Sequence, residues 1–404
     1  MRLVFISQQF PWPLDSGGNI RTYHSLVSLL EHFEITLVSS TPDGQLPADF
    51  PEHKNLTIEL FPIRKNASTM FTSILSSLLR SVPAVISYNR MAGVKERITA
   101  IAQEDLHVVF FCNHLDTWQY VAEIGDRAWI DTHNLMADYY RTEKASGSIS
   151  KRMFYSWQMN SIMEYERSAF DGARGVFFCS DSEREQAQSL SPAGRYTVVP
   201  NGVDLAAFPF EGGTESQVSA RVFTLFFSGH LGYPPNADGI LFFLRSVYPD
   251  LLLAGEREGW EIRVIVAGKS PPDELQDVAR SNPGVQVTGF VPSMRPYIRQ
   301  SDLAIVPLLS GGGTRLKVIE AWSCGLPIVS TSLGAHGIDY EDNADIVIAE
   351  EPQAMIQAIL RLIGSAETRS SMAIAGRKKA ESAYSWTNIM ARLSERLVAD
   401  MDDQ

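Results

Sequence analysis

The chain has 404 residues, of which 45% are hydrophobic, 20% charged and 10% aromatic, a composition typical of a globular protein with two or three domains. Its 35 Lys and Arg residues against 47 Asp and Glu residues give a net charge of −12, which argues against a nucleic-acid-binding protein. No apolar run is long enough for a membrane span, and the start, "MRLVFISQQFPWP", predicts a buried strand and not a signal peptide. The cysteines form no CxxC pair, which favours reduced thiols and a cytoplasmic protein.

Short apolar runs alternate with helical patterns along the whole chain. The runs lie at 2–7, 34–39, 107–112, 128–131, 175–180, 196–200, 222–229, 262–268, 285–289, 303–308, 327–331 and 345–349. Most are β-branched or aromatic without polar alternation, which is typical of strands buried on both faces of a parallel sheet. Helical segments between them indicate βαβ units. We therefore predict an α/β fold of two Rossmann-like, doubly wound parallel-sheet domains with six strands each.

The seam between these domains is expected within 201–220, where turn-forming and polar residues cluster. This gives a first domain at 1–204, a second at 205–385 and a C-terminal helix at 386–404. In open α/β sheets, ligands bind at the carboxyl ends of the strands. We therefore expect the functional site in a cleft between the two domains.

The segment 65–80 predicts a helix with an apolar stripe and basic flanks. Such a helix can rest on an anionic membrane, but packing on its own sheet is the interpretation that the sequence favours. The stripe consists of Met70, Phe71, Ile74, Leu75, Leu78 and Leu79. The segment 139–158, "YYRTEKASGSISKRMFYSWQ", mixes cations with aromatic residues and predicts a mobile loop that either guides an acceptor or is merely solvated.

His133 follows the run 128–131 in "WIDTHNLMADYY". An imidazole at a strand end predicts contact with a ligand, whereas a histidine satisfied within its own domain is the alternative. Asp131 and Asn134 flank it as candidate orienting groups. Lys269 follows the run 262–268 and is either a phosphate or ribose contact or a solvated cation.

Two glycine-rich loops follow predicted strands and precede predicted helices. The first contains Gly17 and Gly18, and the second contains Gly311, Gly312, Gly313 and Thr314. Such loops bring backbone N–H groups and the positive end of a helix dipole to an anion, so each is a candidate phosphate site. Neither matches GxGxxG or the P-loop pattern, and tight turns that need glycine for packing are the alternative.

Arg315, Lys317 and Glu320 begin the helix after the second loop. Two cations beside bare N–H groups would hold a phosphate and stabilise a departing diphosphate without a metal. One solvated cation and one ion pair is the alternative. Glu320 shares a helix face with Lys317 and is a candidate acceptor for ribose hydroxyls, whereas an (i, i+3) salt bridge with Lys317 is the competing interpretation.

These segments together resemble a known family. "GGGTRLKVIEAWSCGLPIVST" is similar to the signature segment of the retaining GT-B glycosyltransferases called glycosyl transferases group 1. Five further segments resemble the family's first glycine loop, the strand end with its active-site histidine, the segment before its interdomain linker, its base-binding region and its final helix, which crosses back onto the first domain. In that order they read "PWPLDSGGNIRTYHSLVSLL", "IDTHNL", "VVPNGVDLAAF", "VTGFVPSMRPYIRQSDLAIVPL" and "YSWTNIM".

The resemblance implies a GT-B architecture whose second domain holds a nucleotide-diphosphate sugar, such as a UDP or GDP sugar. It implies transfer of a hexosyl group, with retention and without a cofactor, to a glycan, glycolipid or small-molecule acceptor on the first domain, and the apolar stripe with basic flanks is the feature of that domain that fits a peripheral membrane contact. His133, Arg315 and Lys317 are then the candidate catalytic residues. The candidate substrate-binding residues are Gly17, Gly18, Lys269, Phe290, Val291, Gly312, Gly313, Thr314, Leu316 and Glu320.

Two departures from the family pattern bear on function. Glu320 matches the second glutamate of the family's Glu-x7-Glu motif, but Gly312 stands where the first would be. His230 and Asn236 stand where the family has an arginine and a lysine that neutralise the diphosphate, and we expect Arg315 and Lys317 to supply these charges instead. The alternatives are a non-catalytic sugar-nucleotide-binding protein, which the missing charges favour, and a GT-B-like nucleotide-sugar epimerase, which the missing carboxylate disfavours.

Overall fold

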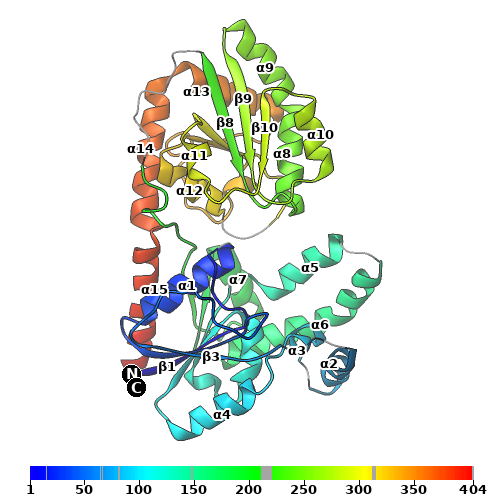
Figure 1. Ribbon diagram of the computed structural model, residues 1–404, viewed down its shortest axis with the longest axis vertical. Coiled ribbons are helices and arrows are strands. Elements are labelled where there is room, and N and C mark those ends of the chain that lie inside the picture. Colours follow the sequence, from blue (N-terminus) through cyan, green and yellow to red (C-terminus); the bar gives the residue numbers. More distant parts are fainter. Residues whose placement is uncertain are drawn as a thin grey trace. The chain divides into compact units, whose positions relative to one another are not determined.

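The computed structural model (Figure 1) describes residues 1–14, 16–63, 65, 67–80, 82–146, 149–210, 221–311 and 315–402. The chain divides into two compact units, Met1–Pro200 with Met390–Gln404, and Asn201–Ile389. The seam expected within 201–220 begins at Asn201, which is the first residue of the second unit. Among the described residues, no helix is both long enough and apolar enough to cross a lipid bilayer.

The first unit is built on a seven-stranded sheet of order β3-β2-β1-β4-β5-β6-β7, with every neighbouring pair parallel. The chain order reverses between β1 and β4, so the carboxyl ends of these two strands flank the switch point where ligands bind in such sheets. The strands are β1 (Arg2–Ser7), β2 (Glu34–Ser39), β3 (Leu56–Leu60), β4 (Val109–Asn113), β5 (Ala128–Asp131), β6 (Gly175–Phe178) and β7 (Tyr196–Val198).

Helices pack around the sheet of this unit and form many of the connections between its strands (Figure 1). They are α1 (Gly17–Leu29), α2 (Ala67–Arg80), α3 (Ala84–Tyr88), α4 (Val94–Glu104), α5 (Met136–Ser146), α6 (Ile149–Gly172) and α7 (Asp181–Leu190), with short 3-10 turns at Leu115–Tyr120 and Ala122–Arg127. The last helix, α15 (Trp386–Asp402), returns from the second unit and packs on α1, where the Ser28 hydroxyl donates to the Met390 carbonyl over 2.9 Å. Most of α15 therefore belongs to the first unit.

The second unit holds a six-stranded sheet of order β10-β9-β8-β11-β12-β13, again with every neighbouring pair parallel. Its switch point lies between β8 and β11. The strands are β8 (Val222–Ser228), β9 (Glu261–Ala267), β10 (Val285–Gly289), β11 (Leu303–Val306), β12 (Ile328–Ser330) and β13 (Val347–Ile348). The helices are α8 (Pro234–Ser246), α9 (Tyr248–Arg257), α10 (Asp273–Arg280), α11 (Arg295–Ile298), α12 (Leu316–Cys324), α13 (Pro352–Gly364) and α14 (Ala366–Ala383).

The predicted fold class, two parallel doubly wound sheets, is confirmed, but the prediction of six strands each is wrong for the first unit. The missing strand is β3, "LTIEL", which pairs with β2 at the sheet edge and is only half-buried. Its polar and apolar residues alternate because one face of an edge strand meets solvent. A search for continuous apolar runs therefore passes over it.

Two further expectations for the first unit are wrong. The segment 139–158 is not a loop but forms most of α5 and the start of α6, because its cations and aromatic residues are compatible with helix and few residues in it break one. Part of the apolar stripe of α2 is not packed on the sheet, since Met70, Phe71 and Leu75 are exposed and Ile74 is half-buried, whereas the side chains of Leu78 and Leu79 lie outside the description.

One glycine in the second unit sets how closely two helices approach. A Cβ added at Gly376 of α14 would stand 2.2 Å from Cδ1 of Trp322 on α12. The indole of Trp322 is fully buried, and its Nε1 donates to the Asp345 carbonyl over 2.8 Å, so it cannot move aside freely. The contact between α12 and α14 therefore depends on the absence of a side chain at 376.

We expect Gly376→Ala to lower the free energy of unfolding by about 1–3 kcal/mol, the usual cost of overpacking, despite alanine's higher helix propensity. Gly364→Ala is the matched control, because a Cβ at this helical residue meets nothing within 4 Å. Urea unfolding of both variants measures the difference. A Gly376→Ala protein as stable as the control would show that α12 and α14 are not packed this closely.

Candidate functional site

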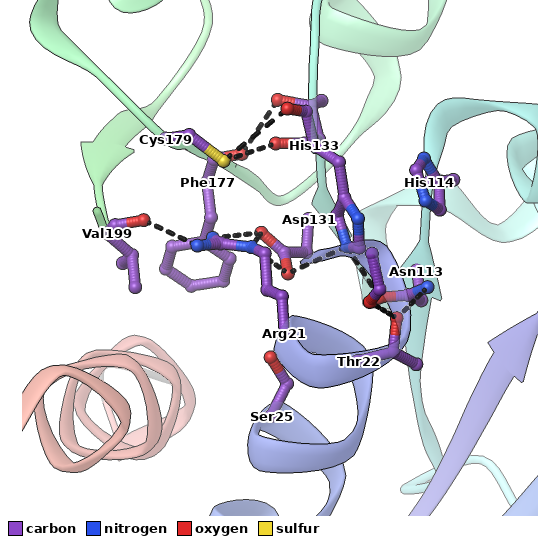
Figure 2. Close-up of polar contacts among 12 residues, drawn as sticks. Arg21, Thr22, Ser25, Asn113, His114, Asp131, His133, Phe177, Cys179 and Val199 are labelled. Atoms are coloured by element: carbon purple, nitrogen blue, oxygen red, sulfur yellow. Dashed lines mark hydrogen bonds and ion pairs between the residues drawn. The ribbon is translucent and has the colours of Figure 1, made fainter. Parts of the chain in front are cut away.

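A buried ion pair joins α1 to the carboxyl end of β5 (Figure 2). Arg21 and Asp131 are both fully buried, with Nη2 to Oδ1 at 2.6 Å and Nε to Oδ2 at 3.0 Å. A further donor of the guanidinium, Nη1, donates to the Val199 carbonyl after β7 over 2.8 Å. Burial alone would lower the pKa of Arg21, but the Asp131 carboxylate outweighs burial and raises that pKa above its ordinary value. The pair stays charged and ties the first glycine loop's helix to two strand ends.

His133 lies beside this pair and faces the first glycine loop. Its Nε2 is 3.1 Å from Oδ1 of Asn113, the last residue of β4, and 3.8 Å from Oδ2 of Asp131. The His114 ring lies against it, with 3.7 Å between centroids. A Cβ added at Gly18 would stand 3.7 Å from its Nδ1. The strand ends and the glycine loop therefore place Nδ1 beside Gly18, a residue without a side chain.

The orientation of the Asn113 amide follows from two hydroxyls. Ser7 Oγ donates to the Gln9 carbonyl over 2.7 Å, and Thr22 Oγ1 donates to the Gly18 carbonyl over 2.8 Å. Because a carbonyl only accepts, each hydroxyl has used its proton and can only accept from Asn113. The amide nitrogen of Asn113 contacts both, at 3.3 Å and 3.0 Å. Its oxygen must then face His133.

This chain of hydrogen bonds sets the tautomer of His133. Since Asn113 Oδ1 accepts, Nε2 of His133 carries the proton and Nδ1 keeps a lone pair. Burial, the neighbouring His114 and the Arg21 cation lower the pKa of His133 well below its ordinary value, so the imidazole is neutral at pH 7. A neutral ring with its lone pair toward Gly18 suits a ligand group that donates a hydrogen bond, such as a sugar hydroxyl.

The second glycine loop lies in the other unit, where Lys317 of α12 reaches the carboxyl end of β8. Its Nζ donates to Asn236 Oδ1 over 2.7 Å and lies 4.4 Å from the centroid of the Phe227 ring. A Cβ added at Gly229 would stand 3.0 Å from the same nitrogen. Burial first, then the nearby Arg315 cation, lowers the pKa of Lys317 to about 7, against the opposite effect of Glu320.

Asn236 stands in α8 at about the place of the family's lysine, and it serves here as the hydrogen-bond partner of Lys317. Its Nδ2 donates to the His230 carbonyl over 3.0 Å, which turns its oxygen toward the ammonium. Position 236 therefore holds the hydrogen-bond partner of a cation and is not itself positively charged. Lys317 brings its positive charge to this spot from α12.

Arg315 precedes α12 and is buried, with 6% of its surface exposed. Its Nε donates to the Leu333 carbonyl over 3.1 Å, and its Nη2 donates to the Gly311 carbonyl over 2.8 Å. Burial lowers the pKa of Arg315, although a guanidinium stays charged at neutral pH. Through these bonds Arg315 holds the start of the second glycine loop in place.

The remaining candidate residues differ in their burial. Glu320 is half-buried, and among the ion pairs of the described residues none joins it to Lys317, so the salt bridge considered as the alternative does not form. Lys269 and Phe290 are exposed beyond β9 and β10, Val291 is half-exposed, and Leu316 is the first residue of α12. Gly17 is the first residue of α1, and the side of the chain at Gly17 and at Asn134 is exposed to solvent. Gly312, Gly313 and Thr314 lie outside the described residues.

The sequence did not point to Arg21, Asn113 or Thr22. A usable signal did exist for Arg21, because a charged residue on a helix that must pack against a sheet needs a buried partner, and Asp131 ends a wholly apolar run. Within the described residues, no group of three or more His, Cys, Asp or Glu side chains is placed to hold a metal ion.

Comparison with known proteins identifies the family. Residues 222–365, most of the second unit, match the model of the family described as glycosyl transferases group 1. This part of the chain is similar to the group 1 glycosyltransferases. The resemblance seen in the sequence is thereby confirmed for the family.

Three relatives align with longer stretches of the chain than the family model does. The chain is 26% identical to a phosphatidylinositol N-acetylglucosaminyltransferase subunit of Arabidopsis thaliana over 59% of its own length, and the match spans about half, 51%, of that relative. It is 21% identical to an uncharacterized 44.6 kDa protein in the cps region of Klebsiella pneumoniae, over 87% of this chain and 88% of that one. It is 29% identical to D-inositol 3-phosphate glycosyltransferase of Pseudarthrobacter chlorophenolicus over 42% of each chain.

Solved structures of similar shape cover nearly the whole chain. Sucrose-phosphate synthase from Thermosynechococcus elongatus superimposes with a TM-score of 0.69 at 14% identity and full coverage of both chains. WaaG, a glycosyltransferase involved in lipopolysaccharide biosynthesis, gives 0.66 at 13% identity, covering 98% of this chain and 99% of that one. Anabaena Alr3699/HepE in complex with UDP-glucose gives 0.65 at 14% identity, covering 99% and 100%. At these identities the likeness establishes the fold, and the chain has the predicted GT-B architecture.

We expect His133 to be neutral, with its proton on Nε2, throughout pH 5.5–8. Nitrogen-15 NMR of the protein labelled at its eight histidines distinguishes the two ring nitrogens directly, and His133→Gln assigns the signal. Asn113→Leu removes the acceptor and should release the Nδ1–H form. A neutral ring with its proton on Nδ1 in the unmodified protein would contradict a hydrogen bond that runs from His133 to Asn113, and a pKa between 6 and 7 would contradict a ring that burial keeps neutral.

Proposed function

We propose that this chain is a retaining hexosyltransferase that moves a sugar from a UDP or GDP sugar to a hydroxyl of a glycan, glycolipid or small-molecule acceptor, without a metal. The observation that carries the proposal is Lys317, whose ammonium lies against Gly229 at the carboxyl end of β8, beside the second glycine loop. The match of residues 222–365 to the group 1 family model supports a transferase. The UDP-glucose complex of the Anabaena protein supports a nucleotide-sugar donor.

Stabilising the departing diphosphate is the central chemical task in such a transfer. In our proposal Lys317, the N–H groups of the second glycine loop and the amino end of α12 share that charge. Arg315 contributes by holding Gly311 through its carbonyl. Glu320, with no ion pair to Lys317, accepts from the ribose hydroxyls, and the base packs near Phe290 and Val291.

The first unit contributes the recognition of the sugar. Nδ1 of His133 accepts a hydrogen bond from a hydroxyl of the transferred sugar, which approaches past Gly18, where a Cβ would stand 3.7 Å from that nitrogen. The acceptor binds on the same unit. We further propose a cytoplasmic protein, which the three buried free cysteines support, and a peripheral contact of the first unit with a membrane.

Turnover decides between this proposal and a non-catalytic sugar-nucleotide-binding protein or an epimerase. Thermal-shift screening with UDP, GDP and dTDP sugars identifies the donor, and hydrolysis or transfer is then followed with excess chelator present. The anomeric configuration of the product, read by NMR, tests retention. Stabilisation by a sugar nucleotide without any hydrolysis or transfer would favour the non-catalytic protein, and an altered sugar on an intact nucleotide would favour the epimerase.

Lys317→Met should weaken UDP binding by about 10- to 150-fold while leaving uridine binding nearly unchanged, because a hydrogen bond to a charged group is worth about 1.5–3 kcal/mol. Titration calorimetry with both ligands measures the two losses. Equal losses for UDP and uridine would remove Lys317 from the phosphate site.

The affinity for UDP should also fall as the pH rises above 7. The pKa of Lys317 is about 7 in the free protein, so at higher pH the amine must take up a proton before it can pair with phosphate. The free energy needed for this protonation weakens UDP binding. Calorimetry from pH 7 to 9 in two buffers measures the proton uptake. Lys317→Arg, which stays protonated, is the matched control and should lose this pH dependence; the same slope in both proteins would assign it to another group.

A further inference from the structure

A pocket of about 350 Å³ lies within the first unit, where the start of α5 meets α6 and α7. Apolar side chains line it from all three sides, namely those of Leu135, Ala137, Met163, Ala187 and Leu190. The carboxyl group of Glu166, on α6, belongs to the same lining, although Glu166 is only 2% exposed. We call this cavity the Glu166 pocket.

The two oxygens of the Glu166 carboxyl group differ in their partners. Oε1 accepts from the backbone N–H groups of Met136 and Ala137, the latter over 3.2 Å, so Glu166 holds the first turn of α5. Oε2 accepts no hydrogen bond from the residues that the structure describes, yet it is not sealed from solvent and so opens to the pocket. Burial raises the pKa of Glu166 to about 7 against the effect of the two backbone hydrogen bonds.

The cation in the pocket lining is engaged by groups other than Glu166. Arg141 Nη1 pairs with Oδ1 of Asp138 at 2.5 Å, and its Nη2 donates to Sδ of Met163 over 3.6 Å. Among the ion pairs of the described residues, none joins Arg141 to Glu166. Asp138 lines the pocket as well, so the ionised lining holds two carboxylates against one guanidinium. A buried charge without a partner is costly, and the pocket therefore lacks one positive charge.

These features select the chemistry of a ligand. The carboxylates of Glu166 and Asp138 would repel an anion. A bare metal ion would find too few oxygen ligands among the apolar walls, and no group of three or more His, Cys, Asp or Glu side chains in the described part of the chain could hold one. An ammonium group on an apolar body satisfies both the carboxylate oxygen and the apolar walls.

We propose that the Glu166 pocket binds a small organic amine, whose ammonium group donates to Oε2 of Glu166 and whose apolar part packs between α6 and α7. Leu135 and Ala137 line the pocket and follow shortly after His133 in the chain, so the ligand contacts the segment that leads from His133 into α5. Binding requires no sugar nucleotide, and the proposal is tested independently of glycosyl transfer.

Methyl NMR of the full chain labelled at its methionines tests the proposal, because Met163 lines the pocket. At pH 8, above the pKa of Glu166, n-hexylamine should shift the Met163 methyl signal, which Met163→Leu identifies. A Kd of about 1 mM or tighter is expected for so small a ligand. The neutral 1-hexanol has the same apolar chain and should bind at least tenfold more weakly, and hexanoate should not bind.

The carboxylate itself is tested by a matched pair of variants. Glu166→Gln keeps an oxygen that accepts from the start of α5 but removes the charge, so the affinity for n-hexylamine should fall at least tenfold. Glu164→Gln changes an exposed carboxylate of the same helix, which pairs with Arg167 and does not line the pocket, and it should bind n-hexylamine like the unmodified chain.

A second pair of variants leaves every buried position unchanged, so it tests the charge even if Glu166→Gln fails to fold. Gln186 and Gln188 are both exposed on α7, but only Gln186 lines the pocket. Gln186→Lys should weaken n-hexylamine binding about two- to fivefold through like-charge repulsion, and Gln188→Lys should not. Absence of a Met163 shift, equal binding of n-hexylamine and 1-hexanol, or equal effects within either pair of variants would each overturn the proposal.

Discussion

The ion pair between Arg21 and Asp131 is the interaction on which the first unit's site depends. It is fully buried and bidentate, and it connects α1 with the ends of β5 and β7. Removing one partner of such a pair leaves an uncompensated buried charge, at a cost of about 3–5 kcal/mol. Because α1 begins in the glycine loop, the pair also sets where Gly18 lies relative to His133. Burial, with His114 and the Arg21 cation, lowers the pKa of His133 and keeps that ring neutral, and Asn113 then decides which nitrogen faces Gly18.

The two glycine loops of this chain are surrounded by groups of different physical character. Around Gly18, hydrogen bonds of fixed direction run from backbone carbonyls through two hydroxyls and Asn113 to an imidazole that does not change charge near neutral pH. Beside Gly311, the main group is Lys317, whose pKa of about 7 makes its charge depend on what binds there. In our proposal the first arrangement recognises a neutral hydroxyl, whereas the second responds to a phosphate.

The first unit combines this chemistry with a second buried carboxylate. The chain that leaves β5 and His133 continues directly into α5, whose first turn is held by Glu166 of α6. Burying one oxygen of this carboxylate is tolerable because it is hydrogen bonded to two backbone N–H groups. The other oxygen has no such compensation from the described residues of the unit. In our proposal an ammonium ligand in the Glu166 pocket supplies it.

The sequence by itself determined the features that depend on local pattern. Continuous apolar runs indicated parallel sheets, glycines after strands indicated the two loops, and the segment from Gly311 onward indicated the family. It failed for β3, whose edge position makes its residues alternate, and for α5 and α6, whose residues form a helix as readily as a loop. Only the tertiary structure decided the partners of Arg21, Asn113 and Lys317, which lie 110, 20 and 81 residues away along the chain. Such pairings depend on which strand ends the fold brings together, and no periodicity in the sequence records that.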